Sequence, residues 1–130
     1  MTRVYMDGVF DLFHVGHLDA IKQCSKLGSV VIIGVVSDKD TQSYKRIPVI
    51  NEVMRCEIIE SCKYVHEVIF PAPLFVSPQF LTDHNIDTVV HGFANDFDYH
   101  NQLPFFQNIN LHRIHYSDRI NTTQIINKLK

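Results

Sequence analysis

The 130-residue sequence has no excess of positive charge, no long apolar run and no secretory signal. Its 12 lysines and arginines are outnumbered by 14 acidic residues, which argues against the basic surface that binds nucleic acid or an anionic membrane. No apolar stretch approaches the roughly 20 residues that span a bilayer. The chain reaches Arg3 and Asp7 without the apolar segment of a signal peptide, and we therefore expect a cytoplasmic protein.

Cysteine is also scarce, and the three present do not form a CxxC pair or an even set for disulfides. Cys24, Cys56 and Cys62 fall at apolar positions of helical stretches, which predicts buried free thiols. The eight histidines give no zinc pattern either, because His112 and His115 are expected on opposite faces of a strand. We expect no metal site made of protein side chains.

The composition that remains is that of one folded domain. Hydrophobic residues make up 45% of the chain and charged residues 20%, which argues against disorder. A chain of 130 residues buries one good core but is too short for two ordinary domains. It contains no linker, repeat or low-complexity tract, so residues 1–130 are expected to form a single domain.

Strand signals alternate with helix signals along the whole chain. Strands are expected at residues 4–6, 29–36, 67–70, 87–91 and 110–115. Helices are expected at 18–27, from Asn51 with apolar positions Met54, Ile58, Ile59 and Cys62, from Ser77-Pro78 to Asn85, and at 124–129. Residues 37–50 are expected to form a loop and 92–108 an irregular segment. The alternation predicts an α/β fold: a single Rossmann-like doubly wound domain with a five-stranded parallel sheet.

The segment His14-Val15-Gly16-His17 lies at the start of the first predicted helix. Free backbone N–H groups and the helix dipole favour an anion there, and two imidazoles on one turn add further donors. Gly16 leaves room for a nucleotide close to the backbone. These features predict a nucleotide triphosphate site, while simple capping of the helix by the two histidines remains the alternative.

Other residues are expected near this segment because ligands of doubly wound sheets bind beyond the carboxyl ends of the strands. That edge gathers residues 7–17, 37–46, 91–98 and 116–123.

Five blocks of the sequence together resemble a known group of enzymes. The blocks are residues 7–17, Asn51-Glu52 with Arg55, residues 62–68, residues 87–92 and residues 120–123. They are similar to the cytidylyltransferases that make CDP-alcohols, including the glycerol-3-phosphate, phosphocholine and phosphoethanolamine enzymes. The resemblance implies a nucleotidyltransferase that transfers CMP from CTP to a small phosphorylated alcohol, releases pyrophosphate and uses Mg²⁺ with the CTP.

The resemblance also implies roles for individual residues. His14, His17 and Lys45 are expected to be catalytic, with the imidazoles contacting the phosphates and the lysine closing over the triphosphate. The expected nucleotide-binding residues are Gly8, Val9, Phe10, Asp11, Gly16, Arg55, Gly92, Arg119, Thr122 and Thr123. Three of these roles have a simpler alternative: Lys45 and Arg55 as solvated cations, and Asp11 as a residue that holds its loop rather than lying near magnesium.

The sequence departs from the family pattern at several positions. Tyr116 stands where relatives carry an arginine, and our hypothesis is that Arg119 swings its guanidinium into the triphosphate site instead. Lys63 occupies a common arginine position and keeps the charge without bidentate geometry. Phe93-Ala94 replaces an acidic pair that often follows Gly92, and Asp96 substitutes for it only if the loop bends differently.

Three questions remain open at this point. The chain is a cytidylyltransferase, an adenylyltransferase with the same loop, or a relative that binds nucleotide without turnover. The acceptor is expected to be an amino-alcohol phosphate, and the aromatic residues Phe93, Phe97, Tyr99, Phe105 and Phe106 form either a cage for its cation or ordinary packing. Relatives are commonly homodimers, so the helix from Arg55 to Lys63 is a candidate interface. We expect no lipid-sensing amphipathic tail after the last helix.

Overall fold

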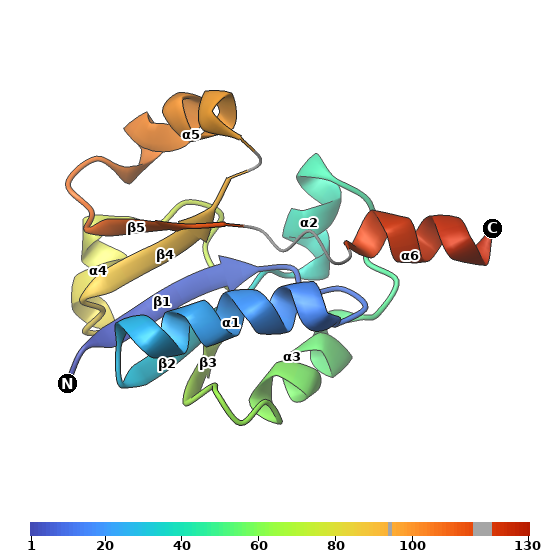
Figure 1. The fold of residues 1–130 in the computed structure, drawn as a ribbon, viewed down its shortest axis with the longest axis horizontal. Coiled ribbons are helices and arrows are strands. Elements are labelled where there is room, and N and C mark those ends of the chain that lie inside the picture. Colours follow the sequence, from blue (N-terminus) through green and yellow to red (C-terminus); the bar gives the residue numbers. More distant parts are fainter. Residues whose placement is uncertain (94, 116–120) are drawn as a thin grey trace.

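The computed structural model describes residues 1–93, 95–115 and 121–130. Its strands are β1 (Arg3–Gly8), β2 (Val30–Val35), β3 (Glu67–Ile69), β4 (Thr88–Gly92) and β5 (Leu111–Ile114). They form one sheet in the order β3-β2-β1-β4-β5, and every neighbouring pair is parallel (Figure 1). The predicted α/β fold with a five-stranded parallel sheet is confirmed.

Helices connect the strands. They are α1 (Val15–Leu27), α2 (Asp38–Tyr44), α3 (Glu52–Glu60), α4 (Pro78–Asp83), α5 (Asp96–Gln102), a 3-10 helix (Leu103–Phe106) and α6 (Thr122–Leu129). As predicted, Asn51 and Ser77 are N-caps whose side chains accept backbone N–H groups of α3 and α4. Within the part of the chain that the structure describes, no helix has the length and apolarity to cross a membrane.

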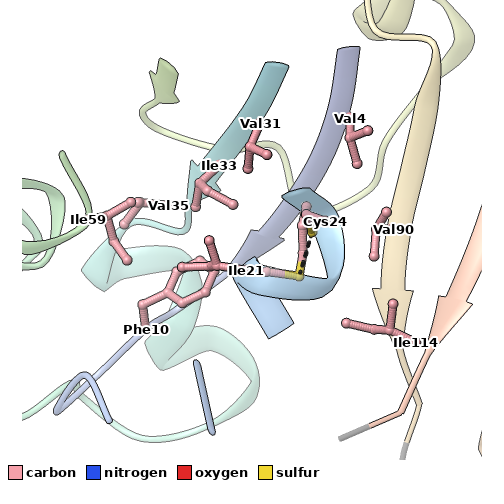
Figure 2. Packing of buried hydrophobic residues seen from close by; sticks show 11 residues of the cluster. Val4, Phe10, Ile21, Cys24, Val31, Ile33, Val35, Ile59, Val90 and Ile114 are labelled. Carbon is pink, nitrogen blue, oxygen red and sulfur yellow. Dashed lines mark hydrogen bonds between the residues drawn. The ribbon is translucent and has the colours of Figure 1, made fainter. Parts of the chain in front are cut away.

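The larger core lies between the sheet and the helices α1 and α3. Side chains from four strands meet Ile21 and Cys24 of α1 and Ile59 of α3 on this face (Figure 2). The Cys24 thiol lies 3.8 Å from the sulfur of Met6 on β1. Because β2 contributes alternate residues to both faces of the sheet, its run of branched apolar residues is explained by burial on both sides.

The opposite face is covered by α4 and the 3-10 helix. Tyr5, Ile32 and Val89 of the sheet pack there with partly buried residues that include Phe80 of α4 and Phe106 of the 3-10 helix. The ring of Tyr5 meets that of Phe80 edge-on, with 5.1 Å between the ring centroids. Helices therefore lie on both faces of the sheet, which makes the domain doubly wound.

Two segments expected to lack regular structure contain helices. Residues 37–50 include α2, which Ser37 caps and which carries Asp38 and Asp40 in its first turn. Residues 92–108 include α5, which Asn95 caps. In both cases a polar N-cap and early acidic residues begin a short helix despite the absence of an apolar stripe.

The phase of α3 also differs from the prediction. Met54, expected on the apolar stripe, is 55% exposed, whereas the neighbouring Arg55 is fully buried. The cysteines are free, but only Cys24 is buried, and Cys56 and Cys62 are partly buried. The expectation of three buried thiols was therefore wrong for two of them.

Candidate active site

A cavity of about 440 Å³ lies beyond the ends of β1 and β4, at the carboxyl edge of the sheet. The strand order turns at this point, with β2 and β3 on one side of β1 and with β4 and β5 on the other. Doubly wound sheets bind their ligands at such a crevice. The predicted site residues on its wall are Gly8, Val9, Phe10, Asp11, His14, Gly16, His17, Lys45, Gly92, Thr122 and Thr123.

The two histidines form a capping box at the N-terminus of α1. The Nδ1 of His14 accepts the backbone N–H of Gly16 at 3.0 Å, and the Nδ1 of His17 accepts the backbone N–H of His14 at 3.2 Å. Because these bonds occupy the Nδ1 lone pairs, the proton of each neutral ring is on Nε2. The histidines thus cap the helix and also line the cavity, and the ring proton of each is on Nε2.

The imidazoles are held in a stack of aromatic rings. Their ring centroids are 3.9 Å apart, Phe13 stacks on His17 at 5.6 Å, and Phe10 meets His17 edge-on at 5.5 Å. Burial, helped by the nearby ring of His14, lowers the pKa of His17 to about 4. Burial also lowers the pKa of His14. Both rings are therefore uncharged hydrogen-bond donors at neutral pH.

The loop between β1 and α1 has an uncommon backbone. Phe10 and Leu12 have φ angles of 56° and 49°, in a region of backbone conformation that residues other than glycine seldom adopt. The Phe10 ring is nevertheless buried and supports His17. A side chain at Gly8 would come within 3.0 Å of that ring, so glycine at this position leaves the room that Phe10 needs. Such backbone conformations are concentrated at functional sites.

Asp11 holds this loop to the next part of the chain. It is buried, and its two carboxylate oxygens accept the backbone N–H groups of Val49 and Ile50 at 2.8 and 2.9 Å. These two bonds fit the loop-holding role. Among the described residues, no group of three or more His, Cys, Asp or Glu side chains is placed to hold a metal ion.

Lys45 follows the last turn of α2 and lines the cavity together with Arg46. Burial and the adjacent Arg46 lower the pKa of the Lys45 amine, and Asp11 partly opposes that shift. Arg46 was not among the predicted site residues. The two side chains supply the cationic part of a wall whose histidines are neutral.

Arg55 does not line the cavity. Its guanidinium donates to the backbone carbonyl oxygens of Ile50, Val9 and Val36 at 3.0, 2.7 and 2.9 Å. It also pairs with the carboxylate of Asp38 at the start of α2. The side chain joins α3 to α2 and to the loop after β1, so in this structure it supports the cavity wall from behind instead of facing a ligand.

The N-terminus of α6 closes another side of the cavity, with Asn121, Thr122 and Thr123 on the wall. The Thr122 hydroxyl lies 3.3 Å from Nε2 of His14 and 3.1 Å from the backbone oxygen of Asp11. The predicted role of Arg119, the substitution at Tyr116 and the residue Ala94 fall outside the described residues.

Sequence reasoning missed a second pair of polar residues on the wall. Asp7 and His91 are near the ends of the adjacent strands β1 and β4, with Oδ1 and Nδ1 3.9 Å apart. Burial raises the pKa of Asp7 to about 6 and lowers the pKa of His91. The sequence analysis placed both segments at the carboxyl edge of the sheet. It did not single out Asp7 and His91 within them.

Asp7 and His91 also line a smaller recess of about 80 Å³ beside the cavity. Its aromatic wall consists of Phe75, Phe105 and Phe106, and the rings of Phe75 and Phe105 are 5.3 Å apart. Five aromatic residues were considered for a cation cage. Phe105 and Phe106 line this recess, and Phe93, Phe97 and Tyr99 do not.

Phe93, at the first position of the family's acidic pair, has a packing role. Phe93 is buried, and its ring meets that of Tyr99 edge-on at 5.0 Å. Asp96 forms an ion pair with Arg113 at 2.8 Å, is largely exposed and is absent from the cavity wall. Lys63 is also absent from that wall, and its ammonium lies 5.2 Å from the ring centroid of Tyr64.

Comparison with known proteins agrees with this geometry. The family model described as cytidylyltransferase-like matches residues 5–127. The chain belongs to the cytidylyltransferase-like family. It is 46% identical to the choline-phosphate cytidylyltransferase of Saccharomyces cerevisiae over 91 residues, which is 68% of this chain and 22% of the yeast protein.

Other proteins are similar at the level of sequence or fold. The ethanolamine-phosphate cytidylyltransferase of Dictyostelium discoideum is 40% identical over 90 residues, 69% of this chain and 25% of that protein. The crystal structure of a lipopolysaccharide core biosynthesis protein from Thermoplasma volcanium matches with a TM-score of 0.72 at 26% sequence identity. The match covers 90% of this chain and 97% of the Thermoplasma chain. The chain spans about a quarter of the length of these two curated relatives.

Proposed function

We propose that this chain transfers CMP from CTP to a small phosphorylated alcohol and releases pyrophosphate. The observation that carries the proposal is the pair of neutral imidazoles at the N-terminus of α1, which faces a cavity that Lys45 and Arg46 also line. Backbone N–H groups of the helix, two ring donors and two cations suit a triphosphate. The names of the relatives above agree with this choice of nucleotide and acceptor class.

The reaction needs alignment and charge stabilisation more than covalent help from the protein. An oxygen of the acceptor's phosphate attacks the α-phosphorus of CTP in line, and the bond from that phosphorus to the pyrophosphate oxygen breaks. The attacking oxygen is already an anion, so no protein nucleophile or base is required. Negative charge grows on the α-phosphate oxygens and on the leaving pyrophosphate in the transition state.

The side chains on the wall match these two regions of charge. His14 and His17 would donate their Nε2–H groups to the α-phosphate, where one aimed donor accelerates a reaction by roughly 10²- to 10³-fold. Lys45, directly after α2, would offset the charge of the leaving pyrophosphate. The neutral imidazoles are suited to donation because each Nδ1 accepts a backbone N–H, which leaves the ring proton on Nε2.

Magnesium is proposed to enter with the nucleotide. The triphosphate itself supplies oxygen ligands, and Mg²⁺ in such sites usually keeps several waters and takes few protein ligands. The ion would neutralise charge on the leaving group. Turnover should therefore stop when EDTA removes the metal and return when Mg²⁺ is added in excess.

For the acceptor, the recess beside the cavity supports an amino-alcohol phosphate. A carboxylate at Asp7 and the rings of Phe75, Phe105 and Phe106 offer a cation both an opposite charge and π faces. Glycerol 3-phosphate has hydroxyl groups that can donate to the carboxylate, but it has no cation that gains from the negative charge and the aromatic rings. Asp7→Asn is then expected to lower kcat/KM for phosphocholine and phosphoethanolamine, with a smaller effect on glycerol 3-phosphate.

With wild type, KM for the ammonium substrates should rise as the pH falls below about 6, because Asp7 becomes protonated.

The decisive experiment measures pyrophosphate release with Mg²⁺ and each of the three phospho-alcohols, using CTP and ATP in parallel. We expect release with CTP, and a loss of about 10²- to 10³-fold in His14→Ala and in His17→Ala. Lys39→Ala, on the exposed part of α2, is the control for loss of a lysine outside the cavity. Release with ATP alone would favour an adenylyltransferase, and CTP binding without release from any acceptor would favour a binder without turnover.

We also infer that the chain forms a homodimer, as the family resemblance implies. Residues 44–54 carry a group of exposed large apolar side chains, next to the predicted interface helix: Tyr44, Ile47, Val49, Val53 and Met54. Such a patch is typical of a surface that another protein covers. Light scattering should give twice the mass of 15.1 kDa, and Val53→Glu should shift the protein to the single mass. A wild-type protein of 15.1 kDa at all concentrations would contradict the dimer.

A further inference from the structure

The Thr122 hydroxyl lies between the ring of His14 and the backbone of Asp11. A carbonyl oxygen only accepts hydrogen bonds and a hydroxyl has a single proton, so Thr122 donates to the carbonyl of Asp11. The hydroxyl oxygen then accepts from Nε2–H of His14, 3.3 Å away. The result is a chain of hydrogen bonds with one direction, from His14 through Thr122 to Asp11.

The other side of the His14 ring leads to the same proton position. Nδ1 accepts the backbone N–H of Gly16, so the neutral ring carries its proton on Nε2. One ring nitrogen is thus fixed by the first turn of α1 and the other by the first residue of α6, which is 108 positions away in the sequence. The first turn of α1 holds the His14 ring at Nδ1, and Thr122 holds it at Nε2.

The series of hydrogen bonds ends at Asp11, a residue that is itself held in place. Asp11 is buried and its carboxylate binds the backbone of Val49 and Ile50. In contrast, no residue of α6 is buried. The hydroxyl of Thr122 therefore connects an exposed helix to a fixed loop, and its position depends on that loop.

We propose that Thr122 is a positioning residue for His14. The inference rests on the proposed CMP transfer at this site. In the arrangement described, the Thr122 oxygen accepts the same Nε2–H that His14 would donate to the α-phosphate, and so keeps that N–H aimed along one direction before the nucleotide binds. The family resemblance implied only that Thr122 contacts phosphate, a role in which its effect would not depend on His14.

A double-mutant cycle separates these two roles. Thr122→Val removes the hydroxyl and keeps the branched shape, while Thr122→Ser keeps the hydroxyl. We expect the valine variant to lower kcat about tenfold, equivalent to about 1.4 kcal/mol, with a smaller change in KM for CTP. The serine variant should recover most of the rate. In a His14→Ala background, measured with radiolabelled CTP, Thr122→Val should cost almost nothing more.

Thr123→Val is the matched control, because Thr123 is the next residue of α6 and also lines the cavity. Its effect, whatever its size, should be the same in the presence and absence of the His14 ring. If Thr122→Val costs the same factor in both backgrounds, Thr122 acts on the nucleotide independently and the proposal is overturned.

A second measurement uses the protein without nucleotide and does not depend on activity. In protein labelled with ¹⁵N at histidine, the ring nitrogen shifts of His14 should move in Thr122→Val and stay in place in Thr123→Val. Unchanged shifts in Thr122→Val would also overturn the proposal. If the wild type turns over no CTP, the proposed function fails, and the ring shifts still decide the role of Thr122.

Discussion

At the scale of single residues, the two imidazoles act through their hydrogen-bond donors and not through charge. Protonation of either Nδ1 would place an N–H against the backbone N–H that it now accepts. Both rings are also partly removed from water, and burial disfavours a charged ring. The same contacts that cap α1 therefore keep the donors of His14 and His17 in the form that a phosphate oxygen can use at neutral pH.

This arrangement predicts a specific pH dependence of stability. In the unfolded chain His17 has an ordinary pKa near 6.5, and in the folded protein the pKa is about 4. Between these values the unfolded state binds the proton and the folded state does not, so stability falls as the pH is lowered through this window. Between pH 7 and pH 5 the free energy of unfolding should drop by about 2 kcal/mol from His17 alone.

Urea unfolding at the two pH values measures this contribution when wild type is compared with His17→Asn. The asparagine side chain cannot titrate, so the variant should lose about 2 kcal/mol less than wild type over the same interval. The other titrating groups are present in both proteins, so their contributions cancel in the difference apart from the coupling between His14 and His17. An identical pH dependence of the two proteins would show that His17 is not held neutral by the fold.

The carboxylates of Asp11 and Asp7 lead to opposite predictions for the same chemical change. Asp11 accepts two backbone N–H groups, and Asp11→Asn would turn an NH₂ group toward one of them. We expect the variant to lose about 1 to 3 kcal/mol of unfolding free energy. Asp7→Asn should instead increase stability at pH 8, because burial has raised the pKa of Asp7 and its charged form is disfavoured.

Chemical denaturation of both variants at pH 8 tests this contrast. If the two variants lose the same unfolding free energy, the predicted difference between Asp11 and Asp7 is wrong. The hydrogen bonds of Asp11 and the desolvation of Asp7 would then not determine how each carboxylate affects stability.

At the scale of helices and strands, the sequence predicted the elements that have an apolar pattern, a cap or both. The strands and α1, α4 and α6 have such signals, and Asn51 and Ser77 begin helices as expected. The helices α2 and α5 were missed because they are short, polar and without an apolar stripe, so only their N-caps mark them. Their stability comes from capping and from the surrounding chain, which a local pattern does not report.

The candidate site was predictable where chemistry and local sequence coincide. The block from Gly8 to His17 is contiguous, and its position after a strand and before a helix determines how it faces the cavity. Arg46, Asp7 and His91 lie in segments that were expected at this edge, but they were not predicted individually, because the side chains that reach the wall depend on the tertiary fold. The burial of Arg55 was also beyond local reasoning, since a charged residue on a helix is usually exposed.

Arg55 illustrates how an element can be held by one side chain. Its guanidinium is fully buried and donates to three backbone carbonyls and to the carboxylate of Asp38. A lysine keeps the charge but offers a single ammonium without the planar fork. Arg55→Lys should therefore reduce the free energy of unfolding by about 3 kcal/mol.

The matched control is Arg46→Lys, which changes the same residue type on the cavity wall, where the side chain is exposed. Its free energy of unfolding should stay within about 0.5 kcal/mol of the wild-type value. Urea unfolding of both variants provides the comparison. Unchanged stability of Arg55→Lys together with weaker CTP binding would instead indicate direct contact between Arg55 and the nucleotide.

At the scale of the whole molecule, the cavity wall combines parts that are far apart in the sequence. It includes the loop after β1, the start of α1, the end of α2, the end of β4 and the start of α6 (Figure 1). A ligand that contacts all of them binds the folded domain and not the unfolded chain. Ligand affinity should then appear directly as an increase in thermal stability.

This linkage gives a test of nucleotide choice that needs no acceptor. At a CTP concentration of 100 times its Kd, with Mg²⁺ present, stabilisation should be about 2.7 kcal/mol, which for a domain of this size raises Tm by about 10 °C. ATP at the same concentration should raise Tm less, because the proposed function requires preference for the cytosine base. The shift with CTP should shrink in Lys45→Ala, which removes a cation from the wall without disturbing the core. Equal shifts with the two nucleotides would mean that the cavity recognises the triphosphate alone, and the preference for CTP would have to be abandoned.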